Sequence, residues 1–265
     1  MIKSTSRKTA LITGASLGIG LEFARLAADD GYNLVLVARD EKKLMDVAQE
    51  LATRYGVNVR IFARDLSDVA GCDEIVAELE KTGISISLLI NNAGYGLYGA
   101  FSDASLNDTL SMMRLNMLSL TSLTRLLLPS MLSRGDGKIL NIASVAAFMP
   151  GPNMAVYYAS KAYVLSFSEA LSSEVRGTGV TVTALCPGPT QTGFEKRAGL
   201  GGSRLFKGSL ATAHDVAVLG YKGVMTGKRL VIAGTQNRLF TTLVRILPRA
   251  LVLFLVARMQ ASSVS

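Results

Sequence analysis

The sequence predicts an α/β fold, with a doubly wound, mostly parallel seven-stranded sheet and helices on both of its faces. Short apolar runs rich in β-branched residues alternate with longer amphipathic stretches, which is the pattern of repeated strand–helix–strand units. The apolar runs are continuous rather than alternating, so both faces of each strand are expected to be buried. The 265 residues contain no Pro-, Gly- or Ser-rich linker and no repeat. We therefore expect residues 1–265 to form a single domain.

Each predicted element follows from its local pattern. A helix over residues 18–30 is indicated by Ile19, Phe23, Leu26 and Ala27 at helical spacing. A second helix is predicted over residues 41–55, with Asp40 as its N-cap. A further helix is predicted over about 156–175. The seven predicted strands are residues 9–13, 33–38, 57–63, 87–91, 138–143, 180–186 and 229–233. Residues 199–208 are predicted to be a loop, and residues 235–265 a C-terminal apolar extension.

Composition narrows the possible partners. The net charge is +8, but the basic residues are scattered, no run of five occurs and Trp is absent, so nucleic-acid binding is not expected. A polyphosphate cofactor would use some of the positive charge. Cys72 and Cys186 match no metal-ligand spacing, so we expect no metal and two reduced thiols in a cytoplasmic protein. Residues 1–8 contain no apolar core of signal-peptide length, so secretion is not indicated.

The first predicted strand runs into the turn Thr13-Gly14-Ala15-Ser16-Leu17-Gly18-Ile19-Gly20. Glycines allow the backbone to turn sharply and approach a pyrophosphate, and the helix that follows presents free N–H groups to the anion. The hydroxyl of Ser16 can add a hydrogen bond to a phosphate. Because the turn joins a strand to a helix, the sequence predicts a Rossmann-type dinucleotide site, the alternative being a tight turn without a ligand.

The spacing Thr-Gly-x-x-x-Gly-x-Gly resembles that of the short-chain dehydrogenase/reductase family, and the resemblance extends from about Lys8 to Gly234. It implies an oxidoreductase that interconverts a carbonyl and an alcohol with a nicotinamide dinucleotide. It also implies a homodimer or homotetramer, assembled through the two long helices that carry Asn116 and Tyr157.

The second predicted strand ends in Val37-Ala38-Arg39-Asp40. An acidic residue at this end would bind the ribose hydroxyls of NAD, but Ala38 occupies the position and Arg39 follows. A guanidinium suits the 2′-phosphate of NADP, so NADP(H) is the predicted cofactor. The alternative is that Arg39 is a solvated surface charge.

The resemblance implies further cofactor-binding positions. Asp65 would accept a hydrogen bond from the adenine amino group, with the Leu66 amide beside it, and the Asn-Asn-Ala-Gly run after the fourth strand would pass close to the cofactor. The Pro-Gly-x-x-x-Thr segment would lie beside the nicotinamide. The complete predicted cofactor set is Gly14, Ser16, Gly18, Ile19, Gly20, Arg39, Asp65, Leu66, Asn92, Ala93, Gly94, Tyr157, Lys161, Pro187, Gly188, Thr190 and Thr192.

Four residues form the predicted catalytic group. Tyr157 and Lys161 are four apart and therefore share one face of a helix; the ammonium is expected to lower the phenol pKa and make Tyr157 the general acid/base. Ser144 ends the fifth strand, where its hydroxyl can bind the substrate oxygen, the alternative being a turn residue. Asn116 lies in an apolar helix. The resemblance implies that Asn116 binds a water that connects Lys161 to solvent. The alternative is a core amide satisfied by backbone groups.

The predicted function is NADPH-dependent interconversion of an apolar ketone or aldehyde and its alcohol. The predicted substrate residues are Tyr95, Phe148, Met149, Met154 and Phe194, with Leu200 in the same loop. Two alternatives stay open: a noncatalytic NADPH-binding sensor, and a membrane-surface reductase of lipid-like carbonyls. His214 precedes Asp215 at a helix start and is expected to be structural. A Ser-His-Asp hydrolase is not expected, because no Gly-x-Ser-x-Gly elbow occurs.

The C-terminal segment 239–259 is strongly apolar but is interrupted by Arg245, Pro248, Arg249 and Arg258. Its uninterrupted apolar run is too short to span a bilayer. It is expected either to pack on its own domain or a sister subunit, or to bind a membrane surface through its apolar residues and flanking arginines. The second alternative would make the cytoplasmic protein membrane-associated.

Overall fold

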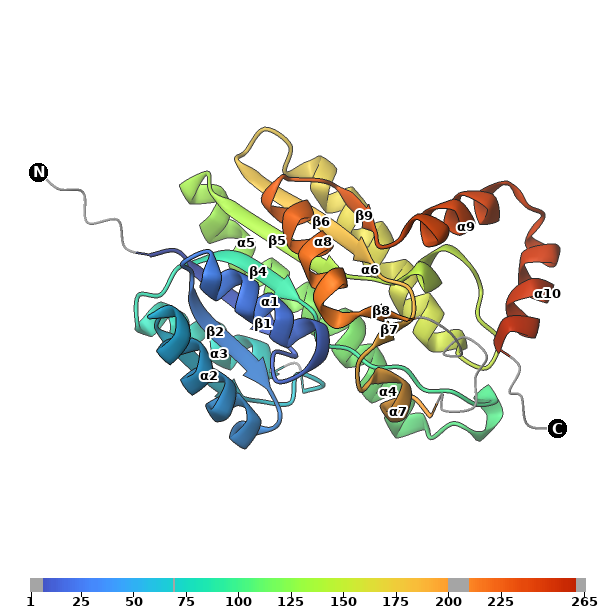
Figure 1. The fold of residues 1–265 in the computed structure, drawn as a ribbon, viewed down its shortest axis with the longest axis horizontal. Coiled ribbons are helices and arrows are strands. Elements are labelled where there is room, and N and C mark those ends of the chain that lie inside the picture. Colours follow the sequence, from blue (N-terminus) through green and yellow to red (C-terminus); the bar gives the residue numbers. More distant parts are fainter. Residues whose placement is uncertain (1–6, 69, 200–209, 261–265) are drawn as a thin grey trace, which may run out of the picture.

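A computed structural model describes residues 7–68, 70–199 and 210–260 of the chain (Figure 1). Its centre is a sheet of seven strands in the order β3-β2-β1-β4-β5-β6-β9, and every neighbouring pair is parallel. The predicted fold class is confirmed. The strands are β1 Thr9–Thr13, β2 Asn33–Ala38, β3 Val59–Ala63, β4 Ile86–Asn91, β5 Gly137–Ile142, β6 Val180–Cys186 and β9 Leu230–Ile232.

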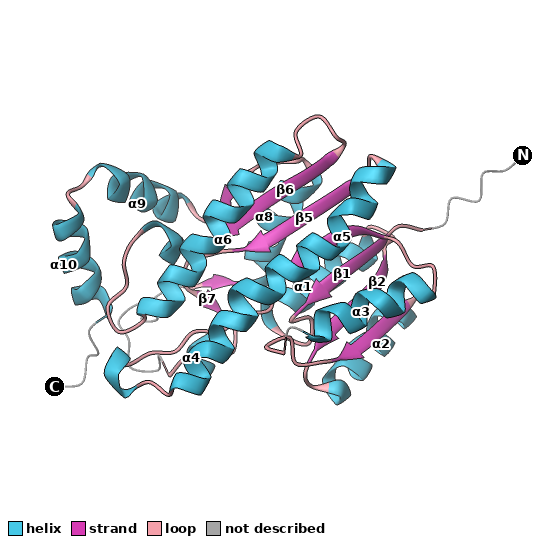
Figure 2. Cartoon of the chain, turned by 180° about the vertical axis from the view of Figure 1, so that it is seen from behind, coloured by secondary structure: helices cyan, strands magenta, loops and turns pink. Residues whose placement is uncertain are grey.

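Helices cover both faces of this sheet (Figure 2). In β1, Ile12 packs against α1 and α8, whereas its neighbour Leu11 points to the other face, toward α3 and α5. This double burial is the physical reason for the continuous apolar strands. The helices are α1 Gly18–Asp29, α2 Glu41–Tyr55, α3 Ala70–Lys81, α4 Leu106–Met113, α5 Leu120–Arg134, α6 Ala155–Glu174, α7 Phe194–Arg197, α8 Ala213–Met225, α9 Thr235–Ile246 and α10 Arg249–Gln260.

The order of the strands reverses at β1. The chain passes from β1 outward to β2 and β3, and then returns to place β4 on the other side of β1. Ligands of doubly wound sheets bind in the crevice at the carboxyl ends of the strands where the order reverses. The glycine turn after β1 and the Asn-Asn-Ala-Gly run after β4 are therefore neighbours.

Several short elements border this crevice. A small parallel pair joins β7 Thr190–Gln191 to β8 Ala211–Thr212. The 3₁₀ turns η1 Phe101–Asp103 and η3 Val145–Phe148 follow β4 and β5. Between α4 and α5 lies a single π-helical segment, η2 Arg114–Ser119, which contains Asn116. A π turn was not predicted; such turns are rare and are frequent at functional sites.

The C-terminal extension forms α9 and α10, which lie at the end of the molecule opposite α2 and α3 (Figure 1). Helix α10 has a narrow buried stripe consisting of Val252, Val256 and Gln260. One side of the extension therefore packs on its own chain, whereas binding of a membrane surface by its other side stays a prediction. No helix in the described ranges is long and apolar enough to cross a membrane. Of the predicted loop 199–208, all but Gly199 lies outside the described residues, as does Leu200.

Candidate active site

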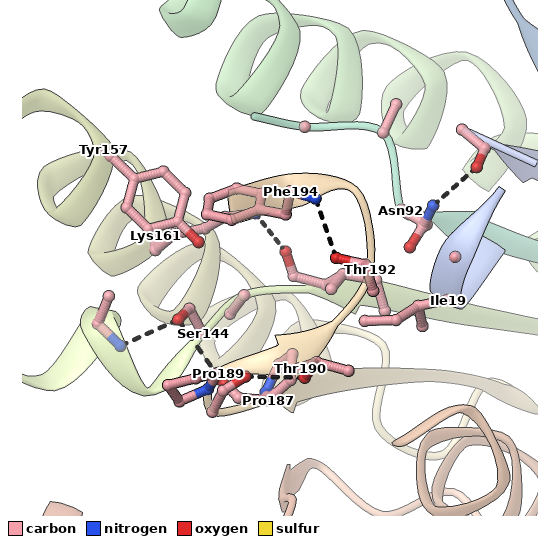
Figure 3. Close-up of a pocket in the computed structure, with 18 of the residues that line it drawn as sticks. Ile19, Asn92, Ser144, Tyr157, Lys161, Pro187, Pro189, Thr190, Thr192 and Phe194 are labelled. Atoms are coloured by element: carbon pink, nitrogen blue, oxygen red, sulfur yellow. Dashed lines mark hydrogen bonds between the residues drawn. The ribbon is translucent and has the colours of Figure 1, made fainter. Parts of the chain in front are cut away.

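A cavity of about 1210 Å³ runs along the carboxyl ends of the strands. Figure 3 shows Tyr157, Lys161 and Ser144 gathered on one side of the cavity, and Asn92 and Ile19 on the other. Most of the predicted site residues line it. They are Gly14, Ser16, Gly18, Ile19, Arg39, Asp65, Leu66, Asn92, Ala93, Gly94, Ser144, Met149, Met154, Tyr157, Lys161, Pro187, Gly188, Thr190, Thr192 and Phe194.

The glycine turn is built to be narrow. Gly14 has a φ of +66°, and a Cβ atom there would lie 2.8 Å from the Asn92 side chain. A Cβ at Gly20 would lie 2.2 Å from the Gly14 carbonyl oxygen. Gly20 was predicted to bind the cofactor, but it does not line the cavity. It is instead the position where the helix and the turn meet without a side chain between them. Asn92 locks the arrangement by donating hydrogen bonds to the carbonyl oxygens of Thr13 at 3.0 Å and Gly14 at 3.2 Å.

The turn fits a dinucleotide phosphate. Helix α1 has no side-chain cap, because Leu17 occupies its N-cap, and its first turn contains no acidic residue. Its first N–H groups are therefore free of a side-chain acceptor at the positive end of the helix dipole, facing the cavity. A Cβ at Gly18 would come within 3.3 Å of the Thr192 side chain, so the glycine turn and the segment after β6 face each other closely.

Charged residues gather where β2 and β3 end. The Arg39 guanidinium lies 3.6 Å from the Asp65 carboxylate. Burial raises the pKa of Asp65, but hydrogen bonds from Ser67 and the charge of Arg39 outweigh this and leave the pKa below its ordinary value. Lys43 and Arg64 line the same end of the cavity and were not predicted from the sequence. Three cations therefore border this end of the cavity, each paired with a carboxylate: Arg39 with Asp65, Lys43 with Asp40 and Arg64 with Glu74.

Tyr157 and Lys161 project from the same face of α6, as predicted. The Lys161 ammonium is 5.8 Å from the centre of the Tyr157 ring, and it donates a 2.8 Å hydrogen bond to the Ile142 carbonyl oxygen. Lys161 is only 6% exposed, and burial lowers its pKa to about 8. The buried ammonium is thus partly stabilised by the end of β5.

The pKa of Tyr157 differs from the expectation. Burial raises the pKa of the hydroxyl above its ordinary value, and a hydrogen bond with Ser144 only partly offsets this. The phenol is therefore protonated at neutral pH, and its pKa is not shifted toward neutrality as was predicted. The reason is that Lys161 directs its hydrogen bond to Ile142, while Tyr158 and Phe194 cover the Tyr157 ring, with the Phe194 ring centre 5.4 Å away.

Ser144 is held at the carboxyl end of β5. Its Oγ accepts a hydrogen bond from the Ala146 N–H at 3.1 Å, which caps η3, and donates to the Pro187 carbonyl oxygen at 3.4 Å. Ser144 thus has the turn role that was its alternative, and at the same time its hydroxyl lies beside that of Tyr157. These two hydroxyls are positioned to contact one substrate oxygen.

Asn116 does not line the cavity. It is 1% exposed, and its Oδ1 accepts from the Tyr95 N–H at 3.1 Å while its Nδ2 donates to the Tyr95 carbonyl oxygen and to Ser160 Oγ. Asn116 is therefore a core amide satisfied largely by backbone groups, which was the alternative to a role in a water relay. Even so, a Cβ at Gly94 would be 3.0 Å from Asn116 Oδ1 and 3.5 Å from Lys161 Nζ, so Asn116 and Lys161 flank the same glycine.

Two of the predicted substrate residues lie elsewhere. The Phe148 ring turns away from the cavity beneath the Arg245 guanidinium, 5.2 Å from its centre. Tyr95 is packed in the core beside α5, and its hydroxyl donates to the Asp108 carbonyl oxygen at 3.2 Å. Met149, Met154 and Phe194 do line the cavity, which makes this end apolar.

The C-terminal extension completes this end of the cavity, which the sequence did not predict. Eight of its residues are in the lining, namely Gln236, Asn237, Phe240, Leu255, Val256, Arg258, Met259 and Gln260. The Tyr98 hydroxyl fixes α10 by donating to the Gln260 backbone oxygen at 2.8 Å. The Gln260 side chain is fully buried, and neither of its amide atoms has a hydrogen-bond partner of ordinary geometry among the described residues. The Tyr158 hydroxyl nevertheless lies within reach of this amide, which lowers the pKa of Tyr158 against the larger, opposite effect of burial. The amide is therefore only loosely held beside the apolar end of the cavity.

The chain belongs to the short chain dehydrogenase family, whose family model matches residues 8–200. The ketoacyl reductase HetN of Nostoc sp. is 37% identical over 188 residues, which is 71% of this chain and 65% of that protein. The very-long-chain 3-oxoacyl-CoA reductase of Anas platyrhynchos is 38% identical over 67% of this chain and 58% of that protein. The chain thus spans less than two thirds of these two relatives.

Solved structures of other proteins share the fold over nearly the whole chain. The short-chain dehydrogenase of Sphingobium yanoikuyae in complex with NADPH has a TM-score of 0.80 and 31% identity, covering 92% of this chain and 97% of that chain. A short-chain dehydrogenase/reductase of Burkholderia phymatum in complex with NAD has a TM-score of 0.80 and 29% identity, covering 90% and 92%. These structures agree with the family model on the family and the fold of this chain.

Proposed function

We propose that this oxidoreductase uses NADPH to reduce the ketone of an apolar, acyl-type substrate, with Tyr157 as the proton donor. One observation carries the proposal: a single cavity connects the phosphate turn and Arg39 with the Ser144, Tyr157 and Lys161 group and then with an apolar end. Cofactor, proton donor and substrate would therefore share one continuous space.

The cofactor preference rests on charge. Gly14, Gly18 and the start of α1 would hold the pyrophosphate, and Arg39 would bind the 2′-phosphate with Lys43 and Arg64 nearby. Ala38 adds no negative charge at this place. NADPH, when bound, supplies the hydride that reduces the carbonyl carbon.

The proton would come from Tyr157. Because burial raises the pKa of its hydroxyl, the side chain carries its proton at neutral pH and can donate it to an oxygen that becomes negative. Ser144 would orient that oxygen, since the two hydroxyls are adjacent. Lys161 would hold the nicotinamide ribose, and its positive charge would stabilise the phenolate that forms. The water relay through Asn116 stays a prediction.

The substrate class follows from the apolar end of the cavity. Met149, Met154 and Phe194 together with the extension suit a hydrocarbon chain, while the Gln260 amide offers one polar contact beyond the reacting carbonyl. A 3-oxoacyl compound has this combination: a ketone, a second carbonyl and an alkyl chain. The names of the two curated relatives above refer to the same chemistry and support the proposal.

The test measures the oxidation of NADPH and of NADH by the purified protein. The substrates are 3-oxoacyl thioesters and simple apolar ketones. The Tyr157→Phe variant is the control, and its affinity for NADPH is measured separately by fluorescence titration. We expect NADPH-selective turnover that the variant loses while its cofactor affinity stays the same. Turnover by the variant would contradict the role of Tyr157. NADPH binding with no turnover of either substrate class would instead favour a sensor.

A homodimer or homotetramer remains the predicted assembly. It is checked by light scattering on the purified protein.

A further inference from the structure

The exterior of the C-terminal extension is unusually apolar. Helix α9 exposes three large side chains at positions i, i+4 and i+7, which lie on one side of a helix, while Thr241 and Val244 on the other side are buried. Helix α10 exposes apolar residues outside its buried stripe. We refer to these residues as the extension face: Leu239, Leu243, Ile246, Leu251, Leu253 and Phe254.

These side chains are more exposed than apolar residues that merely border a core. Ile246 is 75% exposed and Phe254 is 55% exposed. Both views of the molecule place α9 and α10 at one end, beyond the sheet and its covering helices (Figures 1 and 2). An apolar surface gathered on two consecutive helices at the end of a molecule is typical of an interaction site.

The charge around the extension face is of one sign. Residues 235–260 contain Arg238, Arg245, Arg249 and Arg258 and not a single Asp or Glu. Within the described part of the chain, none of these four arginines takes part in an ion pair. Their positive charge is therefore not neutralised by the protein itself.

We propose that the extension face docks on an anionic lipid surface, with its apolar side chains in the headgroup region and its arginines against the lipid phosphates. Apolar residues flanked by unpaired arginines are complementary to such a surface. A second copy of the chain is a poorer occupant, because a two-fold contact places the same patch on both sides and would bring the four arginines of one copy toward those of the other.

The cavity reaches the surface at the same helix. Leu255, Arg258 and Met259 line the cavity and are also exposed, and Leu255 is adjacent in sequence to Phe254. Docking would therefore hold the entrance of the cavity at the lipid surface. On the basis of the proposed function, an apolar acyl substrate would then enter from the membrane rather than from water.

The experiment is vesicle flotation of the purified full-length chain. One set of vesicles consists of phosphatidylcholine alone, and a second contains phosphatidylcholine with phosphatidylglycerol. The double variant Ile246→Asn with Phe254→Asn removes two members of the extension face, neither of which lines the cavity. The matched control is Met45→Asn with Leu219→Asn, which changes residues on α2 and α8 that are 57% and 45% exposed.

We expect the wild type and the control to float with anionic vesicles, and the extension variant to lose most of this binding. Flotation should fall several-fold with phosphatidylcholine alone, because this lipid carries no net charge, and at high salt, because exposed charges are then screened. Absence of flotation, or equal flotation of the extension variant, would overturn the proposal. A wild type that does not float, but is a dimer converted to a monomer by the extension variant, would instead assign this face to self-association.

The readout is independent of catalysis. Oxidation of NADPH with a soluble ketone, measured on the same preparations, should be equal in all three proteins. Failure of flotation with intact turnover would reject only the docking, whereas flotation without turnover would reject only the proposed function.

Discussion

The Lys161 ammonium lies 5.8 Å from the centre of the Tyr157 ring but gives its hydrogen bond to the Ile142 carbonyl oxygen. The two side chains are therefore not joined by a direct hydrogen bond, and Lys161 is not positioned as an ion-pair partner of the phenol. Burial acts on both groups in the direction of neutrality, raising the pKa of the tyrosine and lowering that of the lysine to about 8. The site keeps a protonated phenol beside a cation whose charge is costly to bury.

This cost predicts the effect of Lys161→Met on stability. Between pH 8 and about 10 the unfolded lysine retains its proton while the folded one has lost it, so the unfolded state binds more protons and stability rises with pH. The wild type should therefore gain about 2 kcal/mol in its free energy of unfolding relative to the variant between pH 7 and pH 9.5. Tyr157 contributes the opposite slope only above pH 10, where the folded state keeps its proton.

Urea unfolding of both proteins at the two pH values measures this difference. A constant difference between them would show that the ammonium is well solvated in the folded protein. The variant is also expected to lose turnover.

Asn116→Ala tests the structural role of that amide. The change leaves the N–H and carbonyl groups of Tyr95 without this partner in a buried place, whereas the Ser160 hydroxyl keeps its hydrogen bond to the Tyr157 carbonyl oxygen. We expect a loss of about 3 kcal/mol in the free energy of unfolding. The control is Leu118→Ala, in the same π turn but half exposed, which should cost far less. An Asn116→Ala protein that is as stable as the wild type but inactive would show that the residue serves the reaction rather than the fold.

Sequence patterns located the strands because their cause is local. A strand buried on both faces must be apolar throughout, and Leu11 and Ile12 do point to opposite faces. The strand ends were less well defined. The third strand was predicted to begin at residue 57, but its ladder begins where Val59 pairs with Leu34, and the apolar character of Val57 does not reveal where pairing starts.

Most of the residues predicted from motifs line the cavity, with Gly20 as an exception, whereas residues brought there by tertiary packing were missed. Lys43 and Arg64 reach the cavity from the first turn of α2 and the end of β3. Gln260 arrives from the far end of the chain because Tyr98 anchors α10. Phe148 was placed in the site by its nearness to Ser144, but position in the chain does not determine that it turns beneath Arg245.

Arg39→Asp should reverse the cofactor preference. The substitution removes the guanidinium and sets a second carboxylate beside Asp65, which repels a 2′-phosphate. We expect kcat/KM for NADPH to fall about 10- to 100-fold, as for the loss of a charge-assisted hydrogen bond, with little change for NADH. Lys42→Asp is the matched control, since Lys42 is exposed but does not line the cavity. An unchanged NADPH/NADH ratio in Arg39→Asp would assign the preference to Lys43 and Arg64 instead.

Gln260→Leu separates the acyl-type substrate from a simple ketone. The amide has no partner of ordinary geometry, although the Tyr158 hydroxyl lies within its reach, so a leucine of similar size should leave the fold intact and change the free energy of unfolding by no more than about 1 kcal/mol. If the amide binds the second carbonyl of a 3-oxoacyl compound, kcat/KM for that substrate should fall about tenfold while a simple ketone is reduced as before. The control Gln49→Leu changes an exposed glutamine of α2 and should affect neither. Equal losses for both substrates would mean that Gln260 shapes the cavity as a whole, and an unchanged 3-oxoacyl rate would leave the orphaned amide without a partner in the substrate.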